Sequence, residues 1–165
     1  MTAHRPRAPK PAPLPPRWVI RIAWAIHRAI YVVTGGRRGL RPATPTTWGM
    51  MRLRTIGRRT GEPRVAILGY FEDGPNLVTM AMNGWGAPEP AWWLNLQAQP
   101  DTTVELPTGT RAVHGRIATP EERPRLWAEW ARYDGEEALA TWAARRPGET
   151  AVVVLEPRVA EATRP

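Results

Sequence analysis

The clearest candidates for chemistry are three arginines, Arg58, Arg59 and Arg64, in and just after a short turn. Gly57 and Gly61 flank the turn and allow the backbone to fold tightly, which can expose backbone N–H groups to an anion. The arginine side chain adds a planar fork of donors that matches phosphate and carboxylate groups. These features outline a phosphate site, although composition alone favours an ordinary solvated basic turn.

A second segment could form one wall of a flat cavity. A loop rich in glycine and proline, residues 83–90, leads into a predicted short helix over residues 91–98. Trp92 and Trp93 lie in the first turn of this helix, where backbone N–H groups can face a ligand. Trp92 and Leu96 are four residues apart, so they fit a place in the hydrophobic core equally well. Both interpretations stay open at this point.

The chain offers few residues for other kinds of chemistry. It has no cysteine, which excludes disulfides, thiolate metal sites and cysteine nucleophiles. Its three histidines, His4, His27 and His114, suit neither a metal site nor a Ser-His-Asp triad. The phosphate-binding loops of common NAD and ATP folds are also missing. We therefore expect no metal and no catalytic side chain, but a cofactor that carries out the chemistry itself.

Positive charge is concentrated in the first third of the chain. The 165 residues carry 23 Lys+Arg and 15 Asp+Glu, a net charge of +8, yet residues 1–61 hold 13 basic side chains and no acidic one. Residues 62–165 hold 10 basic and 15 acidic side chains. This distribution points to an anionic partner for the first third. No DNA- or RNA-binding motif matches the remaining chain, so we expect no nucleic-acid partner.

Two segments precede the predicted folded body. Residues 1–16 contain six prolines and are predicted to be a disordered arm. Residues 17–47 are predicted to be an amphipathic helix, over residues 17–33, followed by a linker; one stripe of the helix holds Arg17, Arg21 and Arg28. The helix is too short and too charged to span a bilayer. It fits a position on an anionic membrane surface or packing against its own domain equally well.

From residue 48 onward the pattern changes to short strands separated by turns. The predicted strands cover residues 50–56, 64–71, 77–82, 103–106, 111–117 and 151–155. One short helix follows the third strand, and one or two more precede the last strand, beginning at the capping box Thr119-Pro120-Glu121-Glu122. This order predicts an α+β fold, a small barrel or curved antiparallel sheet of about six strands over residues 48–157. Residues 158–165 are a tail.

Four spaced motifs carry a resemblance to a known family. The chain reads T-I-G-R-R-T-G-E-P-R from Thr55, N-G-W-G-A-P-E-P-A-W-W-L-N-L from Asn83, T-P-E-E-R from Thr119 and V-V-V-L-E-P from Val152. Together these motifs resemble the deazaflavin-dependent nitroreductase family of actinobacteria, which uses coenzyme F420. The resemblance implies a split β-barrel, as in flavin-binding reductases, with the deazaflavin held in a groove. FMN is the alternative cofactor, because it too has a flat tricyclic ring and a ribityl phosphate.

The resemblance also implies which residues bind the cofactor. The turn arginines would bind its phosphate and acidic tail, the following strand would run along it, and Trp92 would be an aromatic wall. The implied residues are the turn Arg58, Arg59, Thr60, Gly61, Glu62, Pro63 and Arg64, the strand Val65, Ala66, Ile67 and Leu68, the ring border Met80, Ala81, Met82 and Asn83, and the helix residues Ala91, Trp92, Trp93, Leu94 and Asn95.

The implied reaction is direct hydride transfer from the reduced deazaflavin to a quinone, a nitroaromatic compound or an activated alkene. The chain would contribute position and electrostatics, and solvent could supply the proton. Trp24, Tyr133 and Trp142 are the expected substrate-pocket residues. Because the chain shows no secretory signal, we expect a cytoplasmic protein, on the inner face of the membrane if residues 17–33 bind lipid. It would be a monomer or a homodimer.

Two departures from the family pattern concern the ring and the acceptor. The family often has a lysine or histidine in an A-P-x-x-P motif, whereas this chain has Ala87-Pro88-Glu89-Pro90, with Glu89 in place of a basic residue. Tyr133 is the single tyrosine of residues 133–142, a segment in which nitroimidazole-reducing members carry several. These departures leave room for an acceptor other than a nitroimidazole or menaquinone. They also leave a non-catalytic F420 or lipid binder of the same fold as the alternative function.

Overall fold

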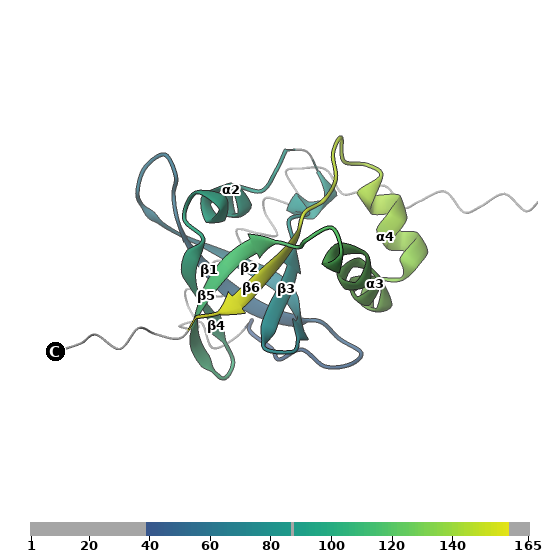
Figure 1. Cartoon of the computed structure of the whole chain (residues 1–165), viewed down its shortest axis with the longest axis horizontal. Helices are drawn as coiled ribbons and strands as arrows, with labels where there is room; N and C mark the ends of the chain where they lie inside the picture. Colours follow the sequence, from purple (N-terminus) through teal and green to yellow (C-terminus); the bar gives the residue numbers. More distant parts are fainter. Residues whose placement is uncertain (1–38, 87, 159–165) are drawn as a thin grey trace, which may run out of the picture.

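The computed structural model describes residues 39–86 and 88–158, which contain the predicted barrel (Figure 1). The predicted arm at residues 1–16, the predicted helix at residues 17–33 with Trp24, and residues 159–165 of the predicted tail lie outside the described residues. Within the described part, no helix is long and apolar enough to cross a membrane.

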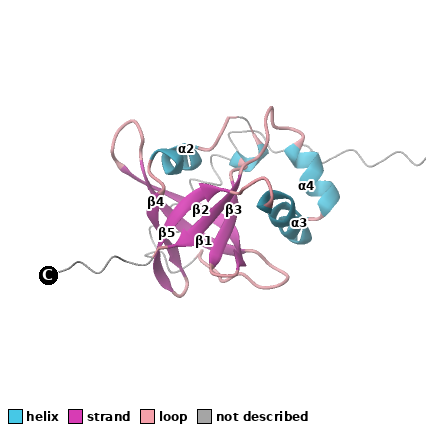
Figure 2. Cartoon of the chain, viewed as in Figure 1, coloured by secondary structure: helices cyan, strands magenta, loops and turns pink. Residues whose placement is uncertain are grey.

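Six antiparallel strands of the described residues form a closed barrel (Figure 2). Their order around the barrel is β1-β2-β3-β6-β5-β4. Alternation along the first strand explains its place, because Met51 and Leu53 point into the barrel while Arg52 and Arg54 point outward. The predicted six-stranded α+β barrel is confirmed. The strands are β1 (Gly49–Ile56), β2 (Pro63–Asp73), β3 (Asn76–Met80), β4 (Asp101–Leu106), β5 (Gly109–Ile117) and β6 (Val152–Pro157).

The helices lie over different parts of the barrel. α2 (Ala91–Ala98) packs against β1, β2 and β5, whereas α3 (Glu122–Asp134) packs against α4 (Glu136–Ala143) and β6 (Figure 1). A single 3-10 turn, η1 (Asn83–Trp85), precedes α2. The predicted capping box before α3 is confirmed, since the Glu122 N–H donates to Thr119 Oγ1 at 3.3 Å and the Thr119 N–H donates to Glu122 Oε2 at 2.8 Å. The helix itself begins at Glu122, two residues after the predicted first position at Pro120.

Two hydrophobic cores share the last strand. The first core fills the barrel and includes Trp93 and Leu96 of α2; the second lies between the barrel wall and α3 with α4. β6 sends Val153 and Leu155 into the first core and its alternate residues into the second. Because residues 152–155 of β6 are buried on both faces, this part of the strand is an unbroken apolar run instead of an alternating one.

One predicted strand was too long. The third strand was predicted to continue to Met82, but β3 ends at Met80. There the Met82 N–H donates back to Met80 O at 3.0 Å, and Asn83 takes a positive φ of 43°. The chain therefore turns away from the barrel at this point and enters the loop that leads to α2.

Candidate functional site

The arginine turn, residues 57–64, joins β1 to β2. The Gly57 N–H donates to Glu62 O at 2.8 Å, and the Thr60 and Gly61 N–H groups both donate to Gly57 O, at 3.1 and 2.7 Å. Gly61 has a φ of +70°, a conformation that glycine adopts without steric cost. The glycines therefore do what the sequence predicted, and the backbone folds back tightly.

The backbone of the arginine turn differs from the expected anion cradle. The Arg58 N–H donates to Asn95 Oδ1 at 3.2 Å, and the Glu62 N–H donates to Thr60 Oγ1 at 3.4 Å. Together with the two bonds to Gly57 O, these contacts occupy most of the N–H groups that the turn could offer. Any anion held here must therefore be bound mainly by the arginine side chains.

Those side chains are exposed and carry unbalanced charge. Arg58 Nη1 donates to the neutral Asn95 Oδ1 at 3.3 Å, and Arg64 Nη2 lies 3.5 Å from Thr60 Oγ1. Within the described residues, none of Arg58, Arg59 and Arg64 forms an ion pair with a carboxylate. The turn thus presents three guanidinium groups, whose combined field attracts a polyanion.

Asn95 of α2 holds the arginine turn in place. Its side chain is 5% exposed, accepts both the Arg58 N–H and Arg58 Nη1, and donates from Nδ2 to Thr55 Oγ1 at 3.4 Å. A buried amide that receives two donors fixes their direction. Asn95 entered the predicted site only through the family resemblance, since nothing local marks it.

The aromatic residues of α2 were expected either to form a wall for a ligand or to lie in the core, and the structure gives a different answer for Trp92 and for Trp93. Trp93 and Leu96 are buried in the first core. Trp92 is half-buried at the edge of that core, with its ring centroid 6.2 Å from that of Trp93. Trp92 is therefore the member of the group that keeps a face available for a ligand.

The first half of β2 has one open edge. β2 pairs with β1 from Pro63 to Tyr70, but it pairs with β3 only through Phe71, Glu72 and Asp73. Among the described residues, no strand pairs with the other edge between Pro63 and Leu68. An open strand edge offers backbone donors and acceptors. This edge begins at the arginine turn and contains the predicted strand Val65, Ala66, Ile67 and Leu68.

The predicted ring border lies next to the far end of that edge. Thr79 Oγ1 donates to Gly69 O at 2.7 Å, so the end of β3 lies beside the middle of β2. Met80 and Ala81 are buried, whereas Met82 is half-buried and Asn83 is exposed. The structure therefore brings the arginine turn, the β2 edge and the end of β3 into one continuous region, with α2 beside the turn.

Two predicted substrate-pocket residues lie on the second core. Tyr133 stacks on Phe71 with ring centroids 6.2 Å apart, and its hydroxyl donates to Thr44 O at 3.4 Å. Burial raises the pKa of Tyr133. Trp142 packs against the same core, as does Met82 of the predicted ring border. The second core thus connects the ring border to Tyr133 and Trp142.

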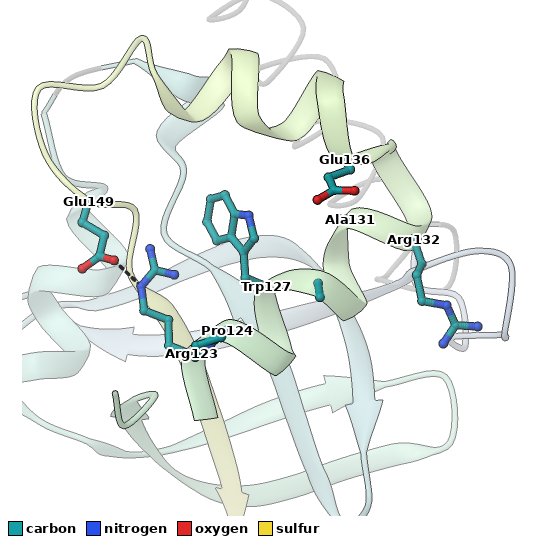
Figure 3. Close-up of a pocket in the computed structure, with 8 residues that line it drawn as sticks. Arg123, Pro124, Trp127, Ala131, Arg132, Glu136 and Glu149 are labelled. Atoms are coloured by element: carbon teal, nitrogen blue, oxygen red, sulfur yellow. Dashed lines mark hydrogen bonds and ion pairs between the residues drawn. The ribbon is translucent and has the colours of Figure 1, made fainter. Parts of the chain in front are cut away.

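A groove of about 740 Å³ lies elsewhere, between α3 and α4 (Figure 3). Its two arginines already have carboxylate partners: Arg123 pairs with Glu149, and Arg132 pairs with Glu129 at 2.8 Å. The Arg123 guanidinium also lies over the Trp127 ring, 4.9 Å from its centroid. The groove therefore lacks the unbalanced charge of the arginine turn, and none of the predicted site residues lines it. The lining residues are Arg123, Pro124, Trp127, Ala128, Ala131, Arg132, Glu136 and Glu149.

Sequence reasoning missed Arg146, which lies next to the predicted ring border. Its side chain is 3% exposed, Nη1 donates to Ala81 O at 2.5 Å, and Nη2 donates to Glu89 Oε1 at 2.9 Å. In the sequence, Arg146 follows a predicted helix, where arginine is usually a solvated charge near the helix end. No local pattern could have shown that it is buried.

Comparison with known proteins identifies the family of the chain. A family model described as F420H(2)-dependent quinone reductase matches residues 24–157. The chain belongs to this family. An F420H(2)-dependent quinone reductase of Mycobacterium tuberculosis is 33% identical over 105 residues, which cover 62% of this chain and 68% of that protein. A second protein of the same organism, with the same activity in its name, is 31% identical over 121 residues, which cover 73% and 96%.

Solved structures show the same fold for this F420H2-dependent quinone reductase family member. An F420H2-dependent reductase superposes with a TM-score of 0.57 at 20% identity, covering 72% of this chain and all of that one. A protein solved as a domain-swapped dimer gives a TM-score of 0.59 at 18% identity, covering 82% and 99%. The family resemblance and the predicted split-barrel fold are confirmed. The family implies an oxidoreductase with F420 as its cofactor.

Proposed function

We propose that the chain binds reduced F420 with its anionic tail on the arginine turn and transfers the hydride to a quinone. One observation carries the proposal: Arg58, Arg59 and Arg64 are exposed together and have no carboxylate partner among the described residues. The phosphate and acidic tail that the family resemblance implies would supply the missing negative charge. FMN lacks the acidic tail, so it would use this turn less completely.

The remaining parts of the site support an extended cofactor. From the arginine turn, the open edge of β2 offers backbone groups along Val65 to Leu68. The ring would lie beyond this edge beside Met80–Asn83, where the chain leaves the barrel. Trp92 is half-buried on α2, the helix whose Asn95 contacts the arginine turn, and it would cover one side of the cofactor. These residues act by holding a flat, negatively charged molecule in one orientation.

The chain's own part in the chemistry is positional. Reduced F420, when bound, supplies a hydride, and a quinone that accepts it also takes up one proton to become a hydroquinone. The proposed cofactor site consists mainly of arginine, asparagine and apolar side chains, and the family resemblance assigns none of them the role of an acid or a base. The proton would therefore come from solvent, and the rate would depend on the distance and angle between the two rings.

The acceptor pocket and the membrane contact belong to the same proposal. Tyr133 and Trp142 would line the acceptor side, which is supported by their place on the core that also holds Met82. Residues 17–33, with Trp24, would contact the membrane surface, where lipid-soluble quinones are found; the support is their amphipathic sequence. Co-sedimentation with anionic and with neutral vesicles tests that contact.

The proposal is tested by titrating the full chain with F420 and, in parallel, with FMN. An Arg58→Ala/Arg64→Ala variant removes two charges from the arginine turn, and Arg125→Ala/Arg132→Ala, which removes two exposed arginines of α3, is the matched control. We expect the turn variant to weaken F420 binding about 100-fold. The control should bind F420 as the wild type does.

Turnover is then measured as oxidation of reduced F420 with a soluble quinone, a nitroaromatic compound and an activated alkene. Quinone reduction by the wild type supports the proposal. Binding of F420 without any turnover would favour the non-catalytic binder. FMN binding as tight as F420 binding, or binding of neither, would overturn the cofactor assignment.

A further inference from the structure

One guanidinium group holds both ends of the loop between β3 and α2. Arg146 donates from Nη1 to Ala81 O at 2.5 Å, where the chain leaves β3. It donates from Nη2 to Glu89 Oε1 at 2.9 Å, one residue before the Pro90 cap of α2. The Arg146 side chain is 3% exposed and that of Glu89 is 37% exposed, so the guanidinium group is shielded from water. Arg146 thus fixes where residues 82–90 begin and where they end.

The pair is an inefficient way to stabilise the fold. Arg146 Nε and Glu89 Oε2 are buried and have no hydrogen-bond partner among the described residues. Burying the Arg146 charge, and leaving one buried polar atom of each residue unsatisfied, offsets much of the attraction between the two groups. The geometry that the pair imposes is therefore the better explanation for its presence.

That geometry bears on the predicted ring border. The Ala81 N–H donates to Ala151 O at 2.9 Å, and Ala81 O accepts Arg146, so both polar groups of Ala81 are bound to the segment that leads into β6. Immediately afterwards Met82 and Asn83 make the turn away from the barrel. The direction in which the ring border leaves the barrel is thus determined at Ala81.

The other end of the loop leads to the arginine turn. Glu89 and Pro90 precede α2, and Asn95 of α2 accepts the Arg58 N–H and Arg58 Nη1. A shift at Glu89 would therefore move the start of the helix that carries Asn95. Glu89, which departs from the family pattern, gains a purpose here as the carboxylate partner of Arg146.

We propose that Arg146 is a positioning residue for hydride transfer, acting through Ala81 and Glu89 on the segment that borders the F420 ring. The inference rests on the proposed function, and it adds Arg146, which is not among the predicted site residues. Because Glu89 neutralises the charge of Arg146, the pair acts by fixing the position of the loop and not through an electric field at the F420 ring. Its loss should therefore change the rate of hydride transfer more than the affinity for F420.

The test compares variants of this pair with a matched control. Arg146→Met removes the guanidinium, Arg146→Lys keeps the charge but not the planar fork, and Glu89→Gln keeps the shape but not the charge. Arg123→Met is the control, because Arg123 contacts Glu149 and Thr150 O on the same segment before β6 without touching the loop. The readouts are thermal unfolding, hydrogen exchange of residues 82–90 without cofactor, the Kd for F420, and kcat with a quinone.

For Arg146→Met we expect kcat to fall about 10- to 100-fold, as a displaced reactive group would cause. The Kd for F420 should rise less than about threefold, because the arginine turn supplies most of the binding energy. Exchange of residues 82–90 should speed up markedly. Arg146→Lys and Glu89→Gln should fall between Arg146→Met and the wild type. Arg123→Met should lower the unfolding temperature while leaving kcat and loop exchange unchanged.

Wild-type kcat and wild-type loop exchange in both Arg146 variants would overturn the inference, and so would an equal loss of kcat in the Arg123→Met control. If Arg146→Met does not fold, the Lys and Gln variants decide the question by the same readouts. If the wild type does not bind F420, the proposed function fails instead. Loop exchange without cofactor still decides whether Arg146 fixes the loop.

Discussion

Arginines beside α3 and arginines in the turn between β1 and β2 have different partners. Around α3, four arginines bind carboxylates: Arg116 with Glu122 and Glu156, Arg123 with Glu149, Arg125 with Asp73, and Arg132 with Glu129. Arg58, Arg59 and Arg64 bind none among the described residues. Both regions have arginine side chains at the surface of the same barrel. They differ in how much positive charge is available to a ligand.

The arginines around α3 form ion pairs that stabilise the folded state. Arg116 holds the pKa of Glu122 down to about 2, and Arg125 holds the pKa of Asp73 below its usual range. The arginine turn keeps its charge, and its backbone is tied internally and to Asn95. Unbalanced positive charge on a well-bonded turn is what a binding site for an anion requires, whereas balanced charge on a helix surface serves stability.

The largest expected effect comes from reversing charge in the arginine turn. Arg59→Glu/Arg64→Glu should weaken F420 binding by about 1,000-fold, because two charge-assisted contacts become repulsive. Isothermal titration measures it. Arg125→Glu/Arg132→Glu reverses two paired arginines and should leave the affinity near that of the wild type. Equal losses in both variants would mean that net charge matters and the location does not.

Giving Arg58 a carboxylate partner should balance part of the positive charge of the arginine turn, as carboxylates do around α3. Asn95→Asp keeps the acceptor for Arg58 but adds a negative charge, and we expect about 20-fold weaker F420 binding. Asn95→Ala, which removes the acceptor without adding charge, should weaken binding by about 10-fold through loss of the anchor. Wild-type affinity in Asn95→Asp would show that the unpaired state of Arg58 is unimportant.

Salt should distinguish the two regions as well. Raising the salt concentration from about 0.05 to 0.5 M should weaken F420 binding by about fivefold, since the arginine turn is exposed and the Debye length shrinks. The Arg58→Ala/Arg64→Ala variant should lose most of this dependence. A variant as salt-sensitive as the wild type would assign the electrostatic attraction to other residues.

The smallest expected effect concerns acid stability of the paired region. The pKa of Glu122 is about 2 in the folded protein and 4.5 for an ordinary glutamate. Its ion pair therefore stabilises the fold fully above pH 4.5, and this stabilisation is lost as the pH falls from 4.5 towards 2. Glu122→Gln should therefore unfold at a lower temperature than the wild type at pH 6. Its unfolding temperature should then fall less steeply between pH 5 and pH 2. Parallel curves for both proteins would contradict this account.

Local patterns predicted much of this fold. The helix over residues 91–98 has the predicted bounds because Pro90 and Pro100 limit it on both sides, and the capping box fixed the approach to α3. The glycine-flanked turn was predicted by its own residues. The end of β3 was not, because Met82 is apolar like the residues before it and nothing local signals the turn.

The parts of the site that local sequence patterns did not mark depend on contacts between distant residues. Asn95 meets Arg58 across 37 positions, and Arg146 meets Ala81 across 65. Neither pairing has a local signature, because a buried arginine and a solvated one look alike in sequence. The family resemblance supplied Asn95 but not Arg146. The arginines of the turn could be predicted from sequence because the anion binding proposed for them depends on their own spacing and charge.

The position of β6 has a consequence for how the chain is made. β6 comes last among the strands of the barrel, yet it lies between β3 and β5 and contributes to both cores. During synthesis, the three strands that leave the ribosome first therefore keep an apolar edge uncovered until the last strand follows. We expect the nascent chain to need protection from aggregation during that interval and to close its barrel only after β6 has left the ribosome.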